Sequence, residues 1–301
     1  MFLTKKYIKK INKNAFTLIE LSIVILVISV MVVGVVTGKS LITKSRLANA
    51  KSLTRQSVVN DMGDDLIAWY ETSLEGSFNP SEIKNDGSSI SKWKDSNKNA
   101  VNKNDANQTT AGNKPTLYQN VFYNSIPGLR FSGAQYLNFE GKRFAKNSYT
   151  VFVVEQRSSG KGENYFIAGA TGGVNQNLVL GYRNNTTVLQ AHWGNDFDIP
   201  TSLPNYSVQN LIPRIHTFLF NNSIGKQYTL NGKHNYADYK QGDDIAKLAP
   251  LISFNSARVG LYSGFYEGDL AEIIMFKRSL KTEEVEAIES YLGSKYGIPV
   301  S

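Results

Sequence analysis

Asn14-Ala15-Phe16-Thr17-Leu18-Ile19-Glu20 is the stretch that decides the fold of the N-terminal region, because it opens a long apolar segment. Between Phe16 and Thr37 the only charged residue is Glu20. A helix of about 22 residues is about 33 Å long, enough to cross the roughly 30 Å hydrocarbon core of a bilayer. The sequence therefore predicts a transmembrane helix over residues 16–37. A carboxylate inside such a helix is costly and indicates a function.

The residues before this segment are basic. Residues 1–15 contain five lysines and no acidic residue, which favours a cytoplasmic N-terminus. A secretory signal peptide would be cut after its apolar region at a small-x-small site, and no convincing Ala-x-Ala site follows Val36. The small residue Ala15 precedes the apolar segment instead. An uncleaved signal-anchor helix is the remaining alternative.

The string from Phe16 to Leu21 resembles the processing site of type IV prepilins and type II secretion pseudopilins. The resemblance covers roughly residues 8–60 and implies cleavage between Ala15 and Phe16 by a prepilin peptidase, followed by N-methylation of Phe16. Glu20 then becomes the fifth residue of the mature chain, where the family has a glutamate. Ala15 departs from the family, which usually has glycine there.

The resemblance also implies a role for Glu20 in filament assembly. The amine of Phe16, freed by cleavage, would meet the Glu20 carboxylate of a neighbouring subunit in an apolar bundle, where a charge attraction is worth several kcal/mol. Breaking such a buried pair typically costs about 3–5 kcal/mol, so Glu20 would set the register of the subunits. A carboxylate that reaches the headgroups without a partner is the alternative. The implied partners are the peptidase, other pilin or pseudopilin subunits and an inner-membrane assembly platform.

Beyond Gly38, basic and apolar residues alternate in a pattern typical of an amphipathic helix, which we expect to continue to about residue 62. Gly34 and Gly38 permit either close helix packing or local unwinding. We therefore expect a cleaved leader at 1–15, a pilin-like helix at 16–65 and a separate domain at 66–301. The chain would be a single-pass protein of the inner membrane and would then join a periplasmic or surface filament.

From residue 66 onward the pattern is that of β-strands. Short β-branched and aromatic runs are separated by Gly, Asn and Pro, and Asn231-Gly232 is a strong hairpin signal. These features predict an all-β sandwich or jelly roll, with residues 75–119 mostly loop. The sequence ends with a predicted short helix that begins at Thr282 as N-cap and ends at Gly297.

Three segments, at 66–70, 126–137 and 268–280, resemble the concanavalin A-like, laminin-G-like jelly-roll family. The likeness implies a β-sandwich over roughly residues 66–298, and this fold hosts lectins, glycosidases and adhesion modules. Glu267, Asp269 and Glu272 have a spacing found in some glycosidases of this fold class. The apolar aromatic surroundings of those enzyme strands are missing, so we expect the chain not to be an enzyme.

Metal and nucleic-acid sites have little support in the sequence. The chain has no cysteine and three scattered histidines, His192, His216 and His234, so we expect no cofactor. The alternation of Asp95, Asn97 and Asn99 is a weak calcium signal. The formal charge of +8 includes the five leader lysines, which leaves about +3 on dispersed residues and does not favour nucleic acid.

Ligand binding by the sandwich would need exposed aromatic side chains, for which Trp93, Trp193 and Tyr266 are candidates by residue type, whereas Trp69 is expected in the core. The sequence predicts a minor pilin or pseudopilin of a type IV filament or type II secretion system, with a sandwich displayed for adhesion or recognition of a glycan or other surface ligand. The alternatives are a tethered glycan-binding lectin module and a glycoside hydrolase.

Overall fold

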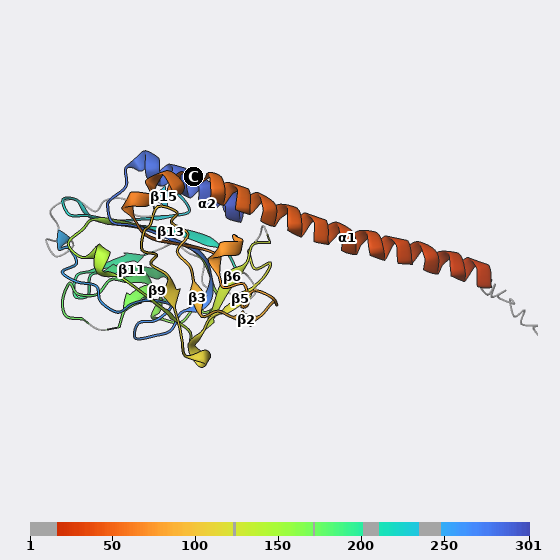
Figure 1. The fold of residues 1–301 in the computed structure, drawn as a ribbon, viewed down its shortest axis with the longest axis horizontal. Coiled ribbons are helices and arrows are strands. Elements are labelled where there is room, and N and C mark those ends of the chain that lie inside the picture. Colours follow the sequence, from red (N-terminus) through yellow and green to blue (C-terminus); the bar gives the residue numbers. More distant parts are fainter. Residues whose placement is uncertain (1–16, 123–124, 171, 201–210, 235–247) are drawn as a thin grey trace, which may run out of the picture. The chain divides into compact units, whose positions relative to one another are not determined.

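The computed structural model describes residues 17–122, 125–170, 172–200, 211–234 and 248–301. It divides the chain into two units, residues 1–44 and residues 45–301. The second unit holds two antiparallel β-sheets and the C-terminal helix (Figure 1). The predicted fold class, a long N-terminal helix with a β-sandwich and a short C-terminal helix, is confirmed.

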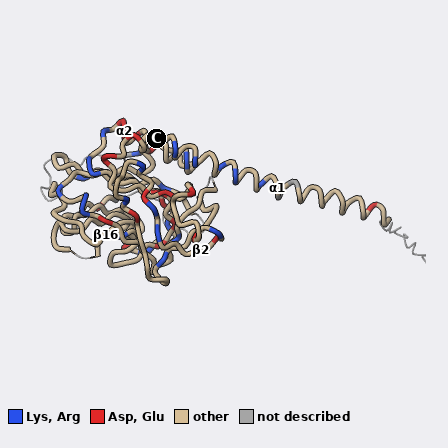
Figure 2. Tube along the Cα trace, viewed as in Figure 1, with Lys and Arg blue, Asp and Glu red and all other residues tan. Residues whose placement is uncertain are grey.

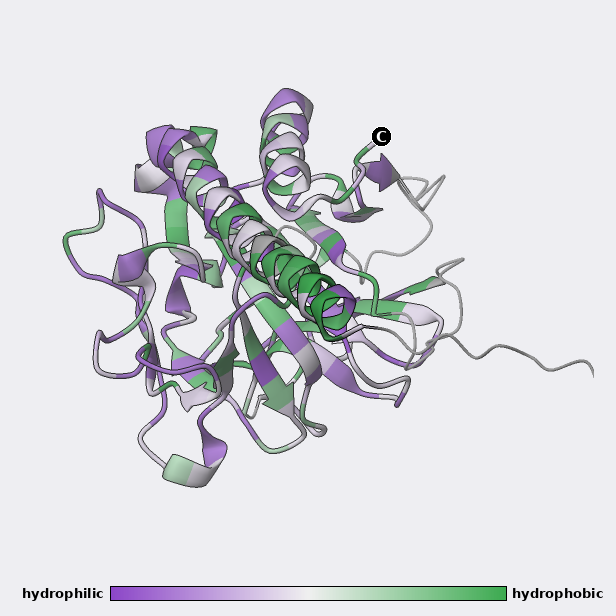
Figure 3. Ribbon diagram, turned by 90° about the vertical axis from the view of Figure 1, so that its right-hand side faces the viewer, coloured by the Kyte–Doolittle hydropathy of each residue, from purple (hydrophilic) through white to green (hydrophobic). Residues whose placement is uncertain are grey.

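Helix α1 (Leu18–Gln56) has 39 residues. Its first half is apolar, carries the acidic Glu20 near its start, and is followed by basic residues (Figures 2 and 3). Between Leu18 and Ile42 the large apolar side chains described are exposed, and the helix is long and apolar enough to cross a membrane. It ends earlier than the predicted residue 62, because Ser57 is extended and caps a 3-10 turn at Val58–Asp65.

The first sheet, sheet A, is built around β17 and has, in the described residues, the order β15-β14-β13-β8-β17-β6-β5-β2, with β1 also pairing with β17. Its strands are β1 (Leu66–Glu71), β2 (Ser88–Ser89), β5 (Thr116–Tyr118), β6 (Gly128–Ser132), β8 (Tyr149–Arg157), β13 (Arg214–Asn221), β14 (Gly225–Leu230), β15 (Lys233–His234) and β17 (Glu267–Phe276). One edge of β17 pairs with β8; the other pairs first with β6 and then with β1.

The second sheet, sheet B, has the order β12-β11-β10-β9-β16-β7-β4-β3. Its strands are β3 (Lys92–Trp93), β4 (Ala106–Asn107), β7 (Leu137–Phe139), β9 (Asn164–Gly169), β10 (Val179–Tyr182), β11 (Thr187–Ala191), β12 (Asp196–Pro200) and β16 (Ala257–Val259). The segment 75–119, expected to be mostly loop, contributes short strands that extend both sheets.

The main core lies between the two sheets. Apolar side chains from both sheets form one buried cluster that includes Phe131, Val153, Phe166, Phe218 and Ile273. Since successive strand residues point to opposite faces, each sheet has a second face outside this core. What covers these two outer faces decides where the domain can meet a partner.

The outer face of sheet A is covered by helices. Helix α2 (Thr282–Tyr296) packs Val285, Ile288 and Leu292 against strands β8, β13 and β17, and Ala50 from the end of α1 joins the same buried cluster (Figure 1). Among the described residues, the outer face of sheet B carries a small apolar cluster, made by Tyr165, Ala168, Val179, Leu189 and Ala191 with Tyr262 packed against it.

Helix α2 differs from the prediction by one residue at its start. The N-cap is Lys281, not Thr282, because the Glu284 carboxylate accepts a 2.8 Å hydrogen bond from the Lys281 amide. Gly297 ends the helix in the left-handed conformation, with φ of 66°, and its amide donates to the Gly293 carbonyl. The predicted C-terminal glycine cap is therefore confirmed.

Candidate functional site

Glu20 caps the N-terminus of its own helix. Its Oε2 accepts hydrogen bonds of 2.8 Å from both the amide and the hydroxyl of Thr17, and the Glu20 amide lies 3.3 Å from Thr17 Oγ1. This reciprocal arrangement is a capping box, which satisfies amides that the first helical turn leaves without partners. The Thr-Leu-Ile-Glu string therefore has a local structural role. Ala15 and Phe16 lie outside the described residues, so the cleavage site and the assembly role of Glu20 stay predictions.

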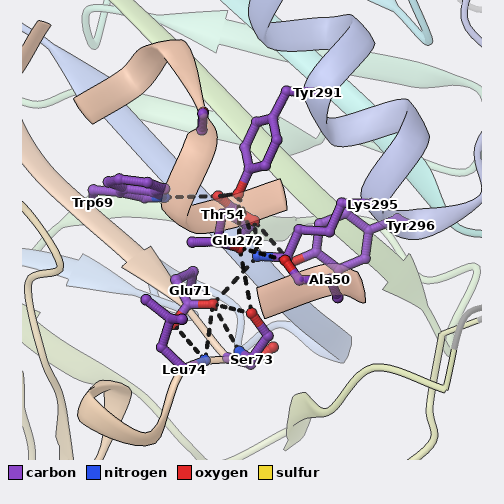
Figure 4. Close-up of polar contacts among 12 residues, drawn as sticks. Ala50, Thr54, Trp69, Glu71, Ser73, Leu74, Glu272, Tyr291, Lys295 and Tyr296 are labelled. Carbon is purple, nitrogen blue, oxygen red and sulfur yellow. Dashed lines mark hydrogen bonds and ion pairs between the residues drawn. The ribbon is translucent and has the colours of Figure 1, made fainter. Parts of the chain in front are cut away.

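A buried ionic network ties the end of α1, strands β1 and β17, and α2 together (Figure 4). Glu272 on β17 is fully buried, and its Oε2 accepts hydrogen bonds from Lys295 Nζ at 2.8 Å and Tyr296 Oη at 2.9 Å. Its Oε1 accepts from Trp69 Nε1 at 2.6 Å and Tyr291 Oη at 2.8 Å. These four donors satisfy both oxygens of the buried side chain.

Glu71 on β1 is the second acid of this network. Its Oε2 lies 3.2 Å from Lys295 Nζ, so one buried ammonium serves two buried carboxylates. Burial by itself would raise the pKa of Glu71. The Lys295 ammonium and hydrogen bonds from Ser73, Ser77 and the Leu74 amide outweigh burial, and the pKa lies below its ordinary value.

The network also contacts α1. Thr54 on the last turns of α1 lies 3.2 Å from the Tyr291 hydroxyl and donates to the Ala50 carbonyl at 3.0 Å. Lys51 and Arg55, three residues before and one residue after Thr54, form ion pairs with Glu75. These contacts fix residues 45–56 to the sandwich, because a displaced helix would leave polar groups of the network unsatisfied.

The proposed glycosidase carboxylates are each committed to a different base. Glu267 pairs with Lys161 at 2.6 Å, Asp269 with Arg130 at 2.8 Å, and Glu272 with Lys295. A retaining glycosidase needs two carboxyl groups on either side of the scissile bond. The arrangement gives the hydrolase alternative no support, and the expectation that the chain is not an enzyme stays a prediction.

Two of the three candidate ligand-binding aromatics were wrongly expected at the surface. Trp93 is fully buried, packs beside Tyr70 and Phe78, and donates its Nε1 hydrogen to the Glu71 carbonyl. Tyr266 is fully buried and donates its hydroxyl to Glu155 at 2.8 Å. Both side chains point into the core, where a buried aromatic with a polar tip is stable once that tip is bonded.

Trp193 is 41% exposed and sits in a strained turn. Trp193 and Gly194, with φ of 29° and 81°, form the two-residue turn between β11 and β12, closed by a bond from the His192 amide to the Asn195 carbonyl. Such a turn favours Asn-Gly. A bulky residue with positive φ costs on the order of 1–3 kcal/mol and points to a function.

Trp193 borders a cavity of about 260 Å³ on the outer face of sheet B. Apolar side chains of β10 and β11 and several polar side chains line it together. The lining residues are Glu163, Tyr165, Val179, Arg183, Leu189, Ala191, Trp193, Asp196, Tyr262 and Ser263. A larger cavity, of about 450 Å³, lies between α2 and strands β13 and β14. Its buried acid Glu289 already accepts 2.6 Å hydrogen bonds from Thr217 and Thr229, so we favour the Trp193 cavity as a ligand site.

The weak calcium candidates hold a loop together. Asp95 Oδ1 accepts from the amides of Trp69 and Asn97, and Asn97 Oδ1 accepts from the Asn99 amide. Within the described part of the chain there is no group of three His, Cys, Asp or Glu side chains that could hold a metal ion. Calcium binding stays a prediction without structural support.

Comparison with known families identifies the N-terminal region. Residues 10–36 match the family model described as the prokaryotic N-terminal methylation motif. The chain therefore carries a prepilin-type motif, which implies processing by a prepilin peptidase and assembly with other pilins. Together with the apolar part of α1, the motif indicates a membrane-anchored N-terminus of a pilin-like subunit. No curated protein matches the sequence.

Solved structures resemble the chain only in fold. An arabinofuranosidase complexed with arabinofuranosyl-α-1,2-xylobiose has a TM-score of 0.56 at 12% identity, covering 79% of this chain and 64% of its own. The binding domain of Paraclostridial Mosquitocidal Protein 1 has a TM-score of 0.51 at 16% identity, covering 76% and 53%. A Trypanosoma rangeli sialidase mutant has a TM-score of 0.45 at 14% identity, covering 79% and 34%. In each case the chain spans less than two thirds of the neighbour's length, and the first two likenesses support the sandwich fold alone.

Sequence reasoning missed the Lys295 network and the contact between the rings of Tyr262 and Trp193. Glu272 and Lys295 are far from Glu71 in the sequence, and no local spacing connects them. For Tyr262, the available signal was its position between Gly260 and Gly264, which marks a turn at the end of a strand.

Proposed function

We propose that the protein is a minor pilin or pseudopilin of a type IV filament or type II secretion system. In this proposal the N-terminal helix packs with the helices of other subunits, and the sandwich is displayed on the filament. The observation that carries the proposal is the methylation motif at residues 10–36, which leads directly into the apolar part of α1.

The structure of α1 supports this role. A soluble protein rarely exposes a large contiguous apolar surface, and such a surface marks a membrane or protein contact. Along Leu18–Val35 the described apolar side chains are each about half exposed or more. Lipid would cover them before assembly and neighbouring helices would cover them afterwards.

The test of this proposal is the N-terminus of the mature chain. The full chain is produced with and without a prepilin peptidase, and its N-terminal peptide is analysed by mass spectrometry. We expect a chain that begins with N-methylated Phe16 only when the peptidase is present. Ala15→Gly, which restores the residue usual in the family, should be processed at least as fast.

The matched control is Ala15→Leu, which places a large residue at the cleavage site and should block processing. A mature chain that keeps residues 1–15 would contradict the proposal. So would a chain that is cut after Thr37, since that result would identify a secretory signal peptide.

Recognition by the sandwich is the second part of the proposal. The exposed, strained Trp193 beside a cavity supports a displayed binding site on sheet B, and we propose that it works without catalysis. A glycan-binding module, the alternative predicted from the sequence, would use the same cavity.

A further inference from the structure

Three aromatic side chains meet at the cavity on the outer face of sheet B. The ring of Tyr262 stands at 64° to that of Trp193, with centroids 5.4 Å apart, and at 67° to that of Tyr165, with centroids 5.7 Å apart. The three rings pack edge to face and form adjacent aromatic walls of the cavity. The negative faces of such rings attract cations, and indole does so most strongly.

The charged groups that line this cavity are mainly acidic. Glu163 and Asp196 contribute carboxylates, and Arg183 contributes the cation. Arg183 is ion-paired with Asp196 and, at 2.5 Å, with Asp198. The three carboxylates and Arg183 together carry a net charge of −2. The site therefore favours a cationic ligand and disfavours an acidic one.

Burial and the nearby carboxylates raise the pKa values of Tyr165 and Tyr262. The pKa of Tyr165 is raised to about 12, by burial first and then by Glu163, with Asp196 adding to the effect and Arg183 opposing it. The pKa of Tyr262 is raised by burial and by the same two carboxylates. Both phenols therefore stay neutral, and their rings remain available as aromatic walls.

Size limits the ligand further. A cavity of about 260 Å³ is below the usual range of about 300–1,000 Å³ for drug-sized ligands. Val179, Leu189 and Ala191 make part of its lining apolar. An apolar lining, aromatic walls and carboxylates suit a ligand that is partly apolar and positively charged.

We propose that the cavity bordered by Trp193, Tyr262 and Tyr165 binds an alkylammonium group, of the kind carried by choline or by a lysine side chain. The rings hold the alkyl and cationic parts of the ligand, and Glu163 and Asp196 supply the countercharge. This inference rests on the recognition part of the proposed function, whose ligand it names, and it is independent of the filament role, because binding is measured on the unassembled chain.

The experiment uses the full chain in a polyoxyethylene detergent, whose head group is neither a sugar nor an ammonium. Trp69 and Trp93 are buried, so a ligand-induced change in indole emission reports mainly on Trp193. The ligands are choline, its uncharged carbon isostere 3,3-dimethylbutanol, Nα-acetyl-lysine amide and methyl glucoside. We expect choline, the lysine derivative or both to bind at least about tenfold more tightly than the isostere and the sugar.

Which of the two cations binds identifies the source of the ligand. Preference for choline points to lipid head groups or choline-bearing glycans, and preference for the lysine derivative points to a protein. Binding of the isostere as tight as that of both choline and the lysine derivative would overturn the proposal, as would binding of the sugar without the cations. Failure to bind any of the four would also overturn it, without bearing on N-terminal processing.

Variants separate binding from folding. Trp193→Asn places a residue that tolerates positive φ in the turn, so the melting temperature should be unchanged or higher, while binding, followed by calorimetry, falls about tenfold or more. Glu163→Gln should weaken binding severalfold. Ser263→Ala is its matched control, because it removes the hydroxyl that donates to Glu163 at 2.7 Å and keeps the charge. Undiminished binding by Trp193→Asn would contradict the assignment.

Discussion

Glu20 and Glu272 are both carboxylates in apolar surroundings, and the chain satisfies them very differently. Glu272 is buried and receives an ammonium, two phenols and an indole from its own chain. Glu20 lies on an exposed apolar helix and bonds Thr17. Among the described residues it has no cationic partner.

The difference teaches how to separate a structural charge from a functional one. A buried charge with a complete set of partners stabilises the fold only as long as each partner is present, because an uncompensated charge is costly. A charge inside a segment that would enter lipid, with no cationic partner among the described residues, favours a partner from another molecule. By this criterion Glu272 belongs to the fold, and we predict that Glu20 acts in assembly.

The largest expected effect is that of Lys295→Met. This change leaves both Glu71 and Glu272 buried without a cation, and we expect it to lower the free energy of unfolding by about 3–5 kcal/mol. Urea unfolding of the full chain, followed through the emission of Trp69, measures it, since that indole donates to Glu272.

Lys161→Met is the matched control for Lys295→Met. It removes the same charge from the pair with Glu267, in which both side chains are about one third exposed, and should cost less than about 1 kcal/mol. Adding Glu272→Gln to Lys295→Met should recover part of the lost free energy of unfolding, because it removes one of the two buried carboxylates that lack a cation. Equal effects of the two lysine variants would contradict the structural role assigned to the network.

The second prediction concerns Glu20→Gln. This variant keeps the side-chain shape and an oxygen that can accept from Thr17, but it removes the charge. If the carboxylate pairs with the N-terminal amine of a neighbour, incorporation into filaments should fall about tenfold or more. Immunoblotting of sheared filaments against the membrane fraction measures it, and the urea midpoint of the sandwich should not move.

Thr17→Val is the control that distinguishes assembly from helix capping. It removes the hydroxyl of the capping box and costs about 1 kcal/mol at the helix N-terminus, while the carboxylate remains. We expect normal or slightly reduced incorporation. If Thr17→Val fails to assemble and Glu20→Gln assembles normally, capping would be the role of this pair and the comparison with Glu272 would not hold.

The same contrast shows what could be predicted from the sequence. The helix and its carboxylate were predictable because the motif and the apolar run are local in sequence. The two sheets followed from the alternation of runs, and the end of α2 from Gly297. Partners distant in the sequence, such as Glu71 and Lys295, were not predictable, because strand order brings them together. The exposure of Trp93 was predicted wrongly because β3 has two residues and shows no periodicity.

The smallest expected effect is a dependence of the sandwich's free energy of unfolding on pH. His192 is buried between Tyr149 and the Ala249 carbonyl, and burial, aided by Lys226, lowers its pKa from 6.5 to about 3. The folded ring therefore stays neutral while the unfolded ring takes up a proton. The neutral His192 ring makes its full contribution to the free energy of unfolding above about pH 6.5. That contribution is lost as the pH falls toward 3. Glu71, whose pKa is also lowered, keeps its contribution above its ordinary pKa of 4.5 and loses it below.

We therefore expect the free energy of unfolding to fall in two stages on acidification. Between pH 7 and pH 5 the loss should be roughly 1–2 kcal/mol, because each such group changes stability by at most about 1.4 kcal/mol per pH unit. His192→Gln, whose amide can replace both ring contacts, should make this first stage smaller, while Glu71 should still cause a decline below pH 4.5. Urea midpoints across this range measure both stages. A first stage unchanged in His192→Gln would assign the titration to another group, whereas Glu20→Gln should leave both stages as they are, because residue 20 lies outside the unit that holds the sandwich.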